Sequence, residues 1–301
     1  MPTPGEDLRR QIAAGTVVLP GVFNAITARL VESVGFSAAY VSGAGVTNAL
    51  TALPDVGLLT LTEMADACRH ITAAVSIPCI GDADTGYGEA LNVARAVREL
   101  ERAGLAGMHL EDQVSPKRCG HLGGKQVIPP EEMARKVRAA AKARTDRSFL
   151  LIARTDARAV EGFEAAIRRA DIYLDAGADA VFPEALESPR EFAEFPRRVR
   201  APLLANMTEF GRSPLLSVED LSRLGWRMVL FPMTAFRVMM KAAREALQEL
   251  RATGTQQGFL DRMQTRAELY ELVRYAEHEA FDREAYGLVR PPEEAAGGTD
   301  S

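Results

Sequence analysis

The chain has 301 residues, of which 47% are hydrophobic and 26% charged, the balance of an ordinary soluble globular protein. Its formal net charge of −5 argues against a surface that binds a phosphate backbone, so we do not expect a nucleic-acid partner. No apolar run reaches the roughly 18 residues of a membrane span, and residues 1–10 lack the apolar segment of a signal peptide. Three cysteines, far apart and odd in number, do not fit a disulfide framework, and a cytoplasmic location is expected.

Eight strand candidates follow one another along the chain. In four of them a glycine ends a helical stretch and an apolar run follows, which suits a helix C-cap before a strand. These four start at Gly35, Gly104, Gly177 and Gly225. The runs are continuously apolar rather than alternating, as expected of strands covered on both faces of a parallel sheet. The other four candidates are residues 17–22, 78–82, 149–154 and 202–206.

Helical segments alternate with these strands, most clearly at residues 89–103, 131–144 and 162–176. Eight strand–helix units without linker composition predict a (β/α)₈ TIM-type barrel occupying residues 1–290 as a single domain. A doubly wound open sheet is the alternative fold. After the eighth helix, near residues 241–251, a further helix is predicted at 264–281. It has no strand of its own, so we expect it to pack on a neighbouring element or on a partner subunit. The tail, residues 291–301, has the composition of a disordered segment.

Polar residues stand at the ends of these strands, and in a barrel the strand ends meet at one face, where active sites lie. For any single one of them, capping of the next helix is the competing interpretation. Capping explains less well why all of them fall at the same face. They are Ser42, Asp82, Asp84, Glu111, Asp112, Arg154, Glu184, Asn206 and Thr208.

Three carboxylates predict a metal site. Asp82 and Asp84 leave a strand together in the segment Asp-Ala-Asp-Thr-Gly, and Glu111 ends the next strand. Oxygen ligands select a hard cation, Mg²⁺ or Mn²⁺, and a chain with only four histidines makes zinc a poor candidate. A local turn with a helix cap is the competing interpretation.

A loop of roughly twenty residues between the fourth strand and the fourth helix has the length of a functional lid. It contains Lys117-Arg118-Cys119-Gly120-His121 and, further on, Lys125. Positive neighbours favour the thiolate, so Cys119 is the predicted proton carrier. Cys68 and Cys79 read as small core residues, and the competing interpretation of Cys119 is an incidental surface cysteine.

Small residues after the second strand, Ser42, Gly43 and Ala44, allow backbone N–H groups to approach an anion. The third glycine of a dinucleotide fingerprint is missing there, since that position is Asn48. Three arginines are candidate carboxylate clamps: Arg154, Arg237 and Arg266. A divalent cation, an anion site, arginines and an acid/base thiol together suggest a small polycarboxylate substrate, cleaved next to a carboxylate.

These residues resemble the isocitrate lyase / phosphoenolpyruvate mutase superfamily, and within it the methylisocitrate lyases, over residues 10–285. The segments that carry the resemblance are YVSGAG (40–45), LPD (53–55), GDADTGYG (81–88), HLEDQVSPKRCGHLGGK (109–125), ARTDA (153–157), FPEA (182–185), ANMTEFG (205–211), FPMTAFR (231–237) and MQTRAELYE (263–271).

The resemblance implies a homotetramer whose last helix is exchanged between subunits, and a place in the methylcitrate cycle of propionate catabolism. It implies retro-aldol cleavage of 2-methylisocitrate to pyruvate and succinate. Asp82 and Asp84 would bind Mg²⁺ with Glu111 in an outer shell, and Cys119 would protonate the succinate carbanion. The base that takes the hydroxyl proton would be Asp55 or Tyr40.

The substrate-binding residues implied by the resemblance fall into groups. Ser42, Gly43, Ala44 and Arg154 would hold the pyruvate half. A second group would hold the succinate half: Gly120, His121, Asn206, Thr208 and Arg237. Glu184 and Arg266 would complete the polar shell, and Phe182 and Leu230 would form a pocket for the substrate methyl group.

Isocitrate lyase remains an alternative, because residues 122–124 read Leu-Gly-Gly as in that family, whereas methylisocitrate lyases have Arg-Pro-Asn there. The chain is, however, shorter than isocitrate lyases, and Phe182 and Leu230 favour the methylisocitrate enzymes. An oxaloacetate decarboxylase or phosphonopyruvate-type enzyme would share the metal site but not the Lys-Arg-Cys-Gly-His loop. A non-catalytic barrel would be expected to have lost Cys119 or an aspartate.

Overall fold

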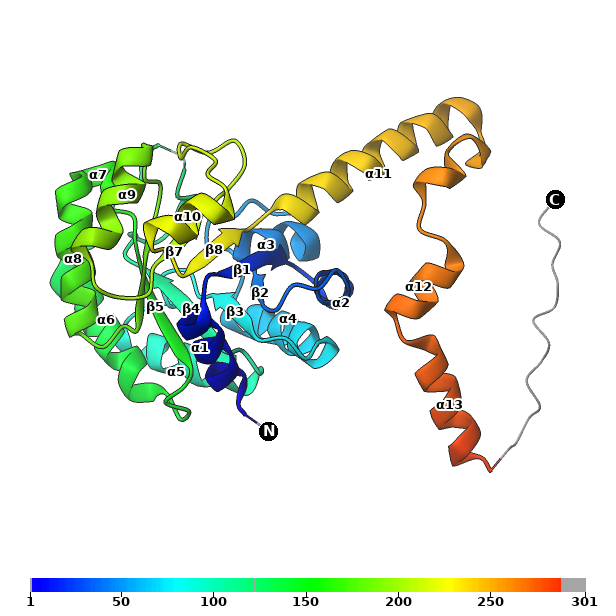
Figure 1. Ribbon diagram of the computed structural model, residues 1–301, viewed down its shortest axis with the longest axis horizontal. Coiled ribbons are helices and arrows are strands. Elements are labelled where there is room, and N and C mark those ends of the chain that lie inside the picture. The colour runs from blue at the N-terminus through cyan, green and yellow to red at the C-terminus, as the bar shows by residue number, and fades with distance from the viewer. Residues whose placement is uncertain (1, 122, 288–301) are drawn as a thin grey trace. The chain divides into compact units, whose positions relative to one another are not determined.

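Eight parallel strands form the centre of the protein in a computed structural model that describes residues 2–121 and 123–287 (Figure 1). In chain order they are β1 Val17–Val22, β2 Ala39–Val41, β3 Cys79–Asp82, β4 Gly107–Glu111, β5 Leu150–Thr155, β6 Ala180–Pro183, β7 Leu204–Asn206 and β8 Met228–Phe231. Each strand pairs with the next along the chain except β6 with β7, and β8 pairs with β1. One parallel bridge, between Val181 and Leu203, joins β6 to β7 and all but closes the sheet. The predicted (β/α)₈ barrel is confirmed, and the open sheet is excluded.

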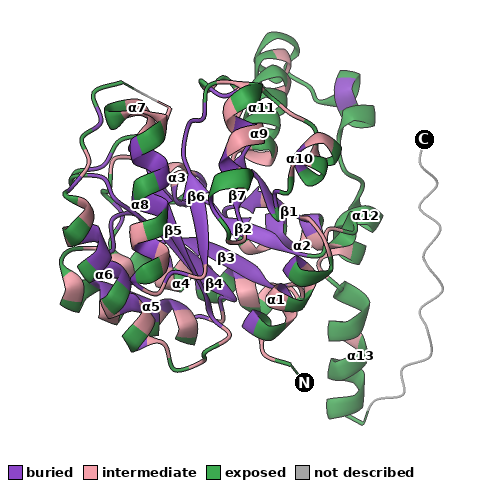
Figure 2. Ribbon diagram, turned by 60° about the vertical axis from the view of Figure 1, so that its left-hand side comes forward, coloured by how far each residue is buried: buried purple, intermediate pink, exposed green. Residues whose placement is uncertain are grey.

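Helices connect the strands and cover the outside of the barrel (Figure 2). Those of the barrel are α1 Pro4–Ala14, α2 Ala25–Ser33, α3 Gly43–Thr51, α4 Leu61–Ala74, α5 Ala90–Arg102, α6 Pro130–Ala143, α7 Arg158–Glu161, α8 Phe163–Asp175, α9 Pro189–Arg198 and α10 Val218–Leu224, followed by α11 Thr234–Thr253. The four predicted capping glycines all have positive φ, between 86° at Gly104 and 110° at Gly177. Each of them therefore occupies the left-handed position that ends a helix before its strand, and the prediction is confirmed.

The barrel interior is filled by one side chain from every second position of each strand, because successive residues of a strand point to opposite faces. Its apolar part includes Leu19, Tyr40, Ile80 and Ile152, and α1 contributes Leu8 to the same cluster. The outward-facing residues of the strands pack with the helices in two further clusters. Apolar residues therefore fill the interior below the strand ends, and the polar residues predicted from the sequence are the last inward-facing positions.

The chain divides into two compact units, Met1–Arg244 and Glu245–Ser301. The second unit holds the end of α11, a 3₁₀-helix Gln257–Arg262, α12 Arg266–Leu272 and α13 Tyr275–Ala285. The single helix predicted over residues 264–281 is wrong in this respect, because the chain breaks at Arg274, whose φ is 55°. The predicted disordered tail, residues 291–301, lies outside the described residues. Within the described ranges, no helix is both long enough and apolar enough to cross a membrane.

Candidate active site

The carboxyl ends of the strands carry the site, because each strand places its last inward-facing side chain at the same mouth of the barrel. On β3 the inward residues are Ile80 and then Asp82, and on β5 they are Ile152 and then Arg154. Residues two positions apart in a strand point to the same face, so Asp82 and Arg154 face the barrel interior like Ile80 and Ile152 but are charged. The side chains that this rule brings to the mouth are buried: Asp82, Glu111, Arg154, Glu184 and Asn206.

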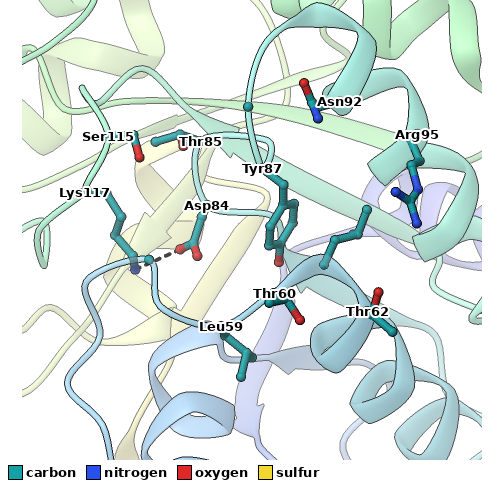
Figure 3. Close-up of a pocket in the computed structure, with 13 residues that line it drawn as sticks. Leu59, Thr60, Thr62, Asp84, Thr85, Tyr87, Asn92, Arg95, Ser115 and Lys117 are labelled. Atoms are coloured by element: carbon teal, nitrogen blue, oxygen red, sulfur yellow. Dashed lines mark ion pairs between the residues drawn. The ribbon is translucent and has the colours of Figure 1, made fainter.

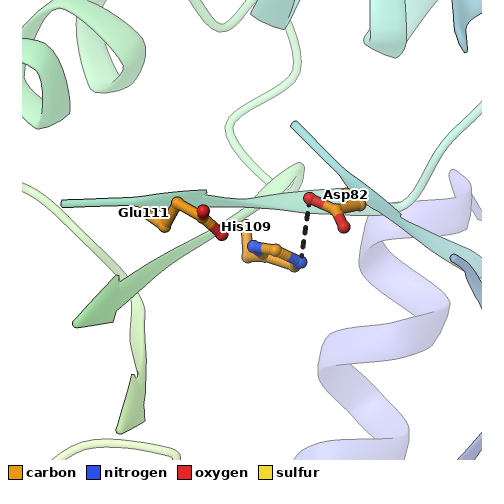
Figure 4. A group of neighbouring side chains, drawn as sticks. All are labelled: Asp82, His109 and Glu111. Atoms are coloured by element: carbon orange, nitrogen blue, oxygen red, sulfur yellow. Dashed lines mark ion pairs between the residues drawn. The ribbon is translucent and has the colours of Figure 1, made fainter. Parts of the chain in front are cut away.

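Asp82, His109 and Glu111 form a buried cluster whose ligand-type atoms all lie within 4.8 Å of one another (Figure 4). His109 Nε2 lies 3.3 Å from Asp82 Oδ1 and 2.7 Å from the Tyr40 hydroxyl, with which it shares a hydrogen bond. Burial lowers the pKa of His109 to about 4, so its ring is neutral at neutral pH. Neither oxygen of Glu111 accepts a hydrogen bond from any of the described residues, although Oε2 lies 3.1 Å from Arg154 Nη1.

The carboxyl groups of this cluster ionise differently. Burial acts to raise the pKa of Asp82, but His109, Lys117 and Arg154 outweigh it and lower that pKa to about 2. For Glu111, burial outweighs the nearby arginine and raises the pKa well above its usual range. Burial likewise raises the pKa of the Tyr40 hydroxyl, with Asp82 adding to the effect. Proximity therefore couples the groups, and a positive charge among them would favour their ionised forms.

Asp84 lies next to this cluster but pairs with a lysine. Its carboxylate is 2.9 Å from Lys117 Nζ (Figure 3), and Lys117 also forms an ion pair with Asp55. Burial is the main reason that the pKa of Asp84 rises to about 6. Its φ of 45° is unusual for a residue other than glycine, a conformation that Asp tolerates better than most residues.

A cavity of about 490 Å³ lies beside this ion pair and is lined by Asp84, Lys117, Thr60, Tyr87 and Arg95, among others (Figure 3). The lining of this cavity reaches the predicted site at Asp84 and Lys117.

The segment after β2 forms the N-terminus of α3. The Ser42 hydroxyl accepts a hydrogen bond from the Gly45 N–H and so caps the helix, as the simpler interpretation of this residue held. The first N–H groups of a helix have no acceptor within it, so Gly43 and Ala44 still offer donors. A Cβ on Gly43 would lie 2.6 Å from Asp82 Oδ2, so only glycine lets the backbone approach that carboxylate.

Arg154 connects the acidic residues of the mouth. Its guanidinium lies 3.1 Å from Glu111, 3.0 Å from Asp156 and 3.3 Å from Glu184. Asn206 donates to Glu184 at 3.2 Å. Burial acts to raise the pKa of Glu184, but Arg154 and the neighbouring histidine hold it well below its usual range. One guanidinium therefore serves three carboxylates here, and Asn206 adds a neutral donor to Glu184.

The predicted lid crosses this mouth. At its base Gln113 and Val127 form an antiparallel bridge, and the Gln113 amide bonds the backbone of Arg118 on both its N–H and its carbonyl. Beyond it, Cys119 is exposed. His121 Nε2 lies 2.8 Å from Glu184 Oε1, and His121 Nδ1 accepts from the Arg212 N–H at 3.0 Å. Residue 122 lies outside the described residues.

Two of the three predicted cationic neighbours of Cys119 are engaged elsewhere. Lys117 is paired with Asp84 and Asp55, and Lys125 with Asp156. Cys68 and Cys79 are buried, as predicted.

The remaining predicted residues lie at different distances from the cluster. Phe182 contacts it directly, because its ring lies 5.4 Å from the His109 ring and 5.1 Å from the Arg154 guanidinium carbon. Leu230 is buried in the barrel interior. Arg237 instead pairs with Glu209 at 3.4 Å and covers Phe210, in the loop that also holds Thr208. Arg266 begins α12 in the second unit, and its role stays a prediction.

Sequence reasoning missed His109 and Asp156. His109 stands two residues before Glu111 on β4, and the two-residue period of a strand places both on the inward face. Asp156 follows β5 two residues after Arg154, so the same rule would have found it.

The donor set fits a divalent cation. In the part of the chain that the structure describes, neither Glu111 oxygen accepts a hydrogen bond. The pKa of Asp82 is lowered, and Gly43 leaves room beside Asp82 Oδ2. Carboxylate oxygens suit a hard cation. His109 could add one nitrogen ligand, which would also suit softer metals: its Nε2 is engaged by Tyr40, whereas Nδ1 makes no hydrogen bond within the described residues.

The fold and the mouth define the class of protein: the chain belongs to the phosphoenolpyruvate phosphomutase family, whose pattern matches residues 8–251. Within it, the chain is 53% identical to a 2-methylisocitrate lyase of Aeropyrum pernix over 282 residues, which are 93% of this chain and 91% of that relative. Two solved structures are also similar. An oxaloacetate acetylhydrolase in complex with 3,3-difluorooxalacetate has a TM-score of 0.91 and 35% identity, covering 96% of this chain and 99% of its own. A phosphonopyruvate hydrolase complex with oxalate and Mg²⁺ has a TM-score of 0.84 and 30% identity, covering 94% and 99%. The family resemblance predicted from the sequence is confirmed.

Proposed function

We propose that this enzyme cleaves 2-methylisocitrate to pyruvate and succinate. The observation that carries the proposal is the position of the Cys119 loop over the same barrel mouth that gathers Asp82, Glu111 and Arg154. The 53% identity to a relative named 2-methylisocitrate lyase supports this choice of substrate within the family.

We assign the cation site to Asp82 and Glu111, with Asp84 beside them, and the cation to Mg²⁺. The carboxylate oxygens support this assignment, and the related phosphonopyruvate hydrolase was solved with Mg²⁺. When bound, the cation would polarise the oxygens of the 2-hydroxy acid and stabilise negative charge that develops on them.

The protein's own groups suit a substrate with several carboxylates. The free N–H groups at the start of α3 and the guanidinium of Arg154 would hold the pyruvate half. Around the other half stand His121, Asn206 and the lid backbone at Gly120. The partial charge of a helix N-terminus favours an anion, and the buried donors would exclude water from the reacting carbons.

In the proposed reaction a base removes the proton of the substrate hydroxyl. The C–C bond then breaks, its electron pair leaves with the succinate carbon, and the carbonyl of pyruvate forms. Cys119 donates its thiol proton to that carbanion, so protons and electrons balance. Asp55 is the better candidate for the base, because its carboxylate lies at the mouth against Lys117, whereas the Tyr40 hydroxyl is buried against His109.

We also infer a tetramer in which the second unit packs on a neighbouring subunit. Phe259 is the buried large apolar residue of the unit's described part, whereas Phe281 and Leu260 expose 74% and 55% of their surface. Exposed apolar side chains of this size favour a protein interface.

The assay that tests the function offers 2-methylisocitrate and isocitrate, with Mg²⁺, to the purified enzyme and follows pyruvate and glyoxylate separately. We expect pyruvate to form faster from the methylated substrate. Faster release of glyoxylate would show that the chain is an isocitrate lyase, and release of neither would refute the lyase assignment.

A further inference from the structure

The Lys125 ammonium is buried at the base of the lid, where it contacts two acceptors that belong to different parts of the fold. Nζ lies 2.6 Å from Asp156 Oδ1 and donates a second hydrogen bond to the Gly120 carbonyl. The Lys125 side chain is 1% exposed and the Asp156 side chain is fully buried. A buried ammonium is costly unless it is paired and hydrogen-bonded, so this contact is made or lost as a whole.

Asp156 is a fixed point for this contact. It follows β5 directly, its backbone N–H donates to Asp112 at 2.8 Å, and its carboxylate receives Arg154 Nε at 3.0 Å. Asp112 and Arg154 therefore fix Asp156 from two sides, and Lys125 links the fixed Asp156 carboxylate to the lid.

In the lid, the acceptor for Lys125 is the backbone carbonyl of Gly120. A Cβ at Gly120 would lie 2.4 Å from the Glu184 side chain and 2.5 Å from Arg154 Nη2, so its backbone rests directly on the charged network of the mouth. The Gly120 carbonyl is one residue beyond Cys119. On the other side of the thiol, the Arg118 backbone is bonded to Gln113. Cys119 thus lies between two anchored neighbours, although its own side chain is exposed.

We propose that Lys125 is a positioning residue for Cys119. By its hydrogen bond to the Gly120 carbonyl, Lys125 fixes the lid backbone next to Cys119 so that the thiol faces the reacting carbon of the substrate. Lys125 does not touch the substrate, since its ammonium is enclosed between Asp156 and the lid backbone. The inference rests on the proposed function for the role of Cys119, but the order that Lys125 gives the lid is a property of the protein without substrate.

The test compares Lys125→Met, which keeps the length of the side chain and removes its donors, with Lys142→Met, which removes an exposed lysine of α6. Lid order is measured as the rate at which an arginine-specific protease cleaves after the exposed Arg118, a site that neither substitution alters. We expect Lys125→Met to accelerate this cleavage about tenfold or more and to lower kcat by roughly 10- to 100-fold with little change in KM, the scale of loss when a reacting group is displaced by about 1 Å. Lys142→Met should behave as the wild type.

The readouts separate the possible outcomes. Unchanged cleavage after Arg118, or a kcat within about twofold of the wild type, would overturn the proposal. If cleavage at arginines throughout the barrel accelerates as much as cleavage after Arg118, Lys125 serves general stability, and this result would also overturn the proposal. If the wild type cleaves neither substrate, the proposed function fails, whereas the protease rates still show whether Lys125 orders the lid.

Discussion

At the scale of single residues, the mouth of the barrel combines charged groups that stabilise one another with one thiol that stands apart. Arg154 alone approaches three carboxylates, and Glu184 is reached by Arg154, His121 and Asn206. Removing one member of a buried pair typically costs about 3–5 kcal/mol, because the remaining charge loses its partner. Substitutions at Cys119 and at Phe182, the apolar wall beside His109 and Arg154, test the chemistry without this cost.

Cys119→Ser should lower kcat by about 10²–10⁴-fold, the usual loss when a positioned general acid is removed. The hydroxyl that replaces the thiol is a much weaker acid, and because Cys119 is exposed the fold should be unaffected. The measurement is turnover of 2-methylisocitrate beside the Tm of each protein. Cys68→Ser, at a buried position, is the control, and it should lower the Tm while leaving kcat nearly unchanged. Near-normal turnover of Cys119→Ser would remove the thiol from the mechanism.

Asp82→Asn should weaken Mg²⁺ binding by more than about 100-fold, since even residues behind metal ligands typically contribute 10–100-fold. The change keeps the shape of the side chain and removes its charge. Binding is measured by titration calorimetry of the metal alone, and chelation followed by Mg²⁺ should abolish and restore the wild-type activity. Asp66→Asn, on the exposed face of α4, is the control. Full activity after exhaustive chelation would exclude a metal-dependent reaction.

Phe182→Trp should reduce the preference for 2-methylisocitrate over isocitrate. A pocket for one methyl group can discriminate by roughly 10–200-fold, and overpacking costs about 1–3 kcal/mol. Phe182 is 1% exposed and contacts His109 and Arg154, so a larger ring must expand toward the mouth. The measured quantity is the ratio of kcat/KM for the two substrates. Phe195→Trp, in the outer core, should destabilise the protein without changing that ratio.

At the scale of elements, three loops at the strand ends are joined through His121. The lid supplies the ring, the loop after β6 supplies Glu184, and the loop after β7 supplies the Arg212 N–H. Nδ1 of the ring therefore faces the loop after β7, and Nε2 faces Glu184. Glycine at 211 permits this approach, because a Cβ there would lie 2.6 Å from His121 Nδ1.

Gly211→Ala should therefore displace His121 and lower kcat/KM by about tenfold or more, an effect of the size expected when a binding group moves by a fraction of 1 Å. The backbone at Gly211 is not in the left-handed region, so alanine itself is tolerated there. The comparison is steady-state kinetics of Gly211→Ala and of Gly15→Ala, where an added Cβ meets nothing within 4 Å. Equal kcat/KM values in the two variants would show that the lid does not depend on this contact.

The sequence predicted elements and strand ends well, because glycine caps and apolar runs are local signals. All eight strands were found, and Asp82, Glu111, Arg154 and Glu184 do meet at one mouth. It could not predict which cation serves which carboxylate. Lys117 turns to Asp84 and Asp55, and Lys125 to Asp156, and these choices depend on the positions of loops rather than on spacing. The break at Arg274 was missed for another reason, because helical periodicity continues across it.

At the scale of the whole molecule, the barrel and the second unit differ in how they bury apolar surface. The barrel has three clusters of buried apolar residues, whereas α12 and α13 bury none of their residues. A helical segment of this kind needs a partner surface to be stable, because short isolated helices are marginal in water.

Phe281→Glu should lower the mass of the particle in solution from that of a tetramer to that of a smaller species. A charge on an apolar residue that is 74% exposed in the single chain disrupts only an interface that covers it. The mass is measured by light scattering after gel filtration. Leu91→Glu, at an apolar residue of α5 that is 87% exposed, is the matched control. An unchanged tetramer, or a wild type that is monomeric, would contradict the inferred role of the second unit.

The sharing of Arg154 among three carboxylates also limits how such an enzyme can diverge. Loss of the Arg154 charge would leave Glu111, Glu184 and Asp156 without that partner at once, so an ancestor that lost it would pass through a destabilised intermediate. The apolar wall at Phe182 and the loop at Gly211 carry no such penalty. New substrates are therefore more accessible in evolution through substitutions at these uncharged positions than through the charged centre. The same set of charged residues can then serve several carbon–carbon bond chemistries.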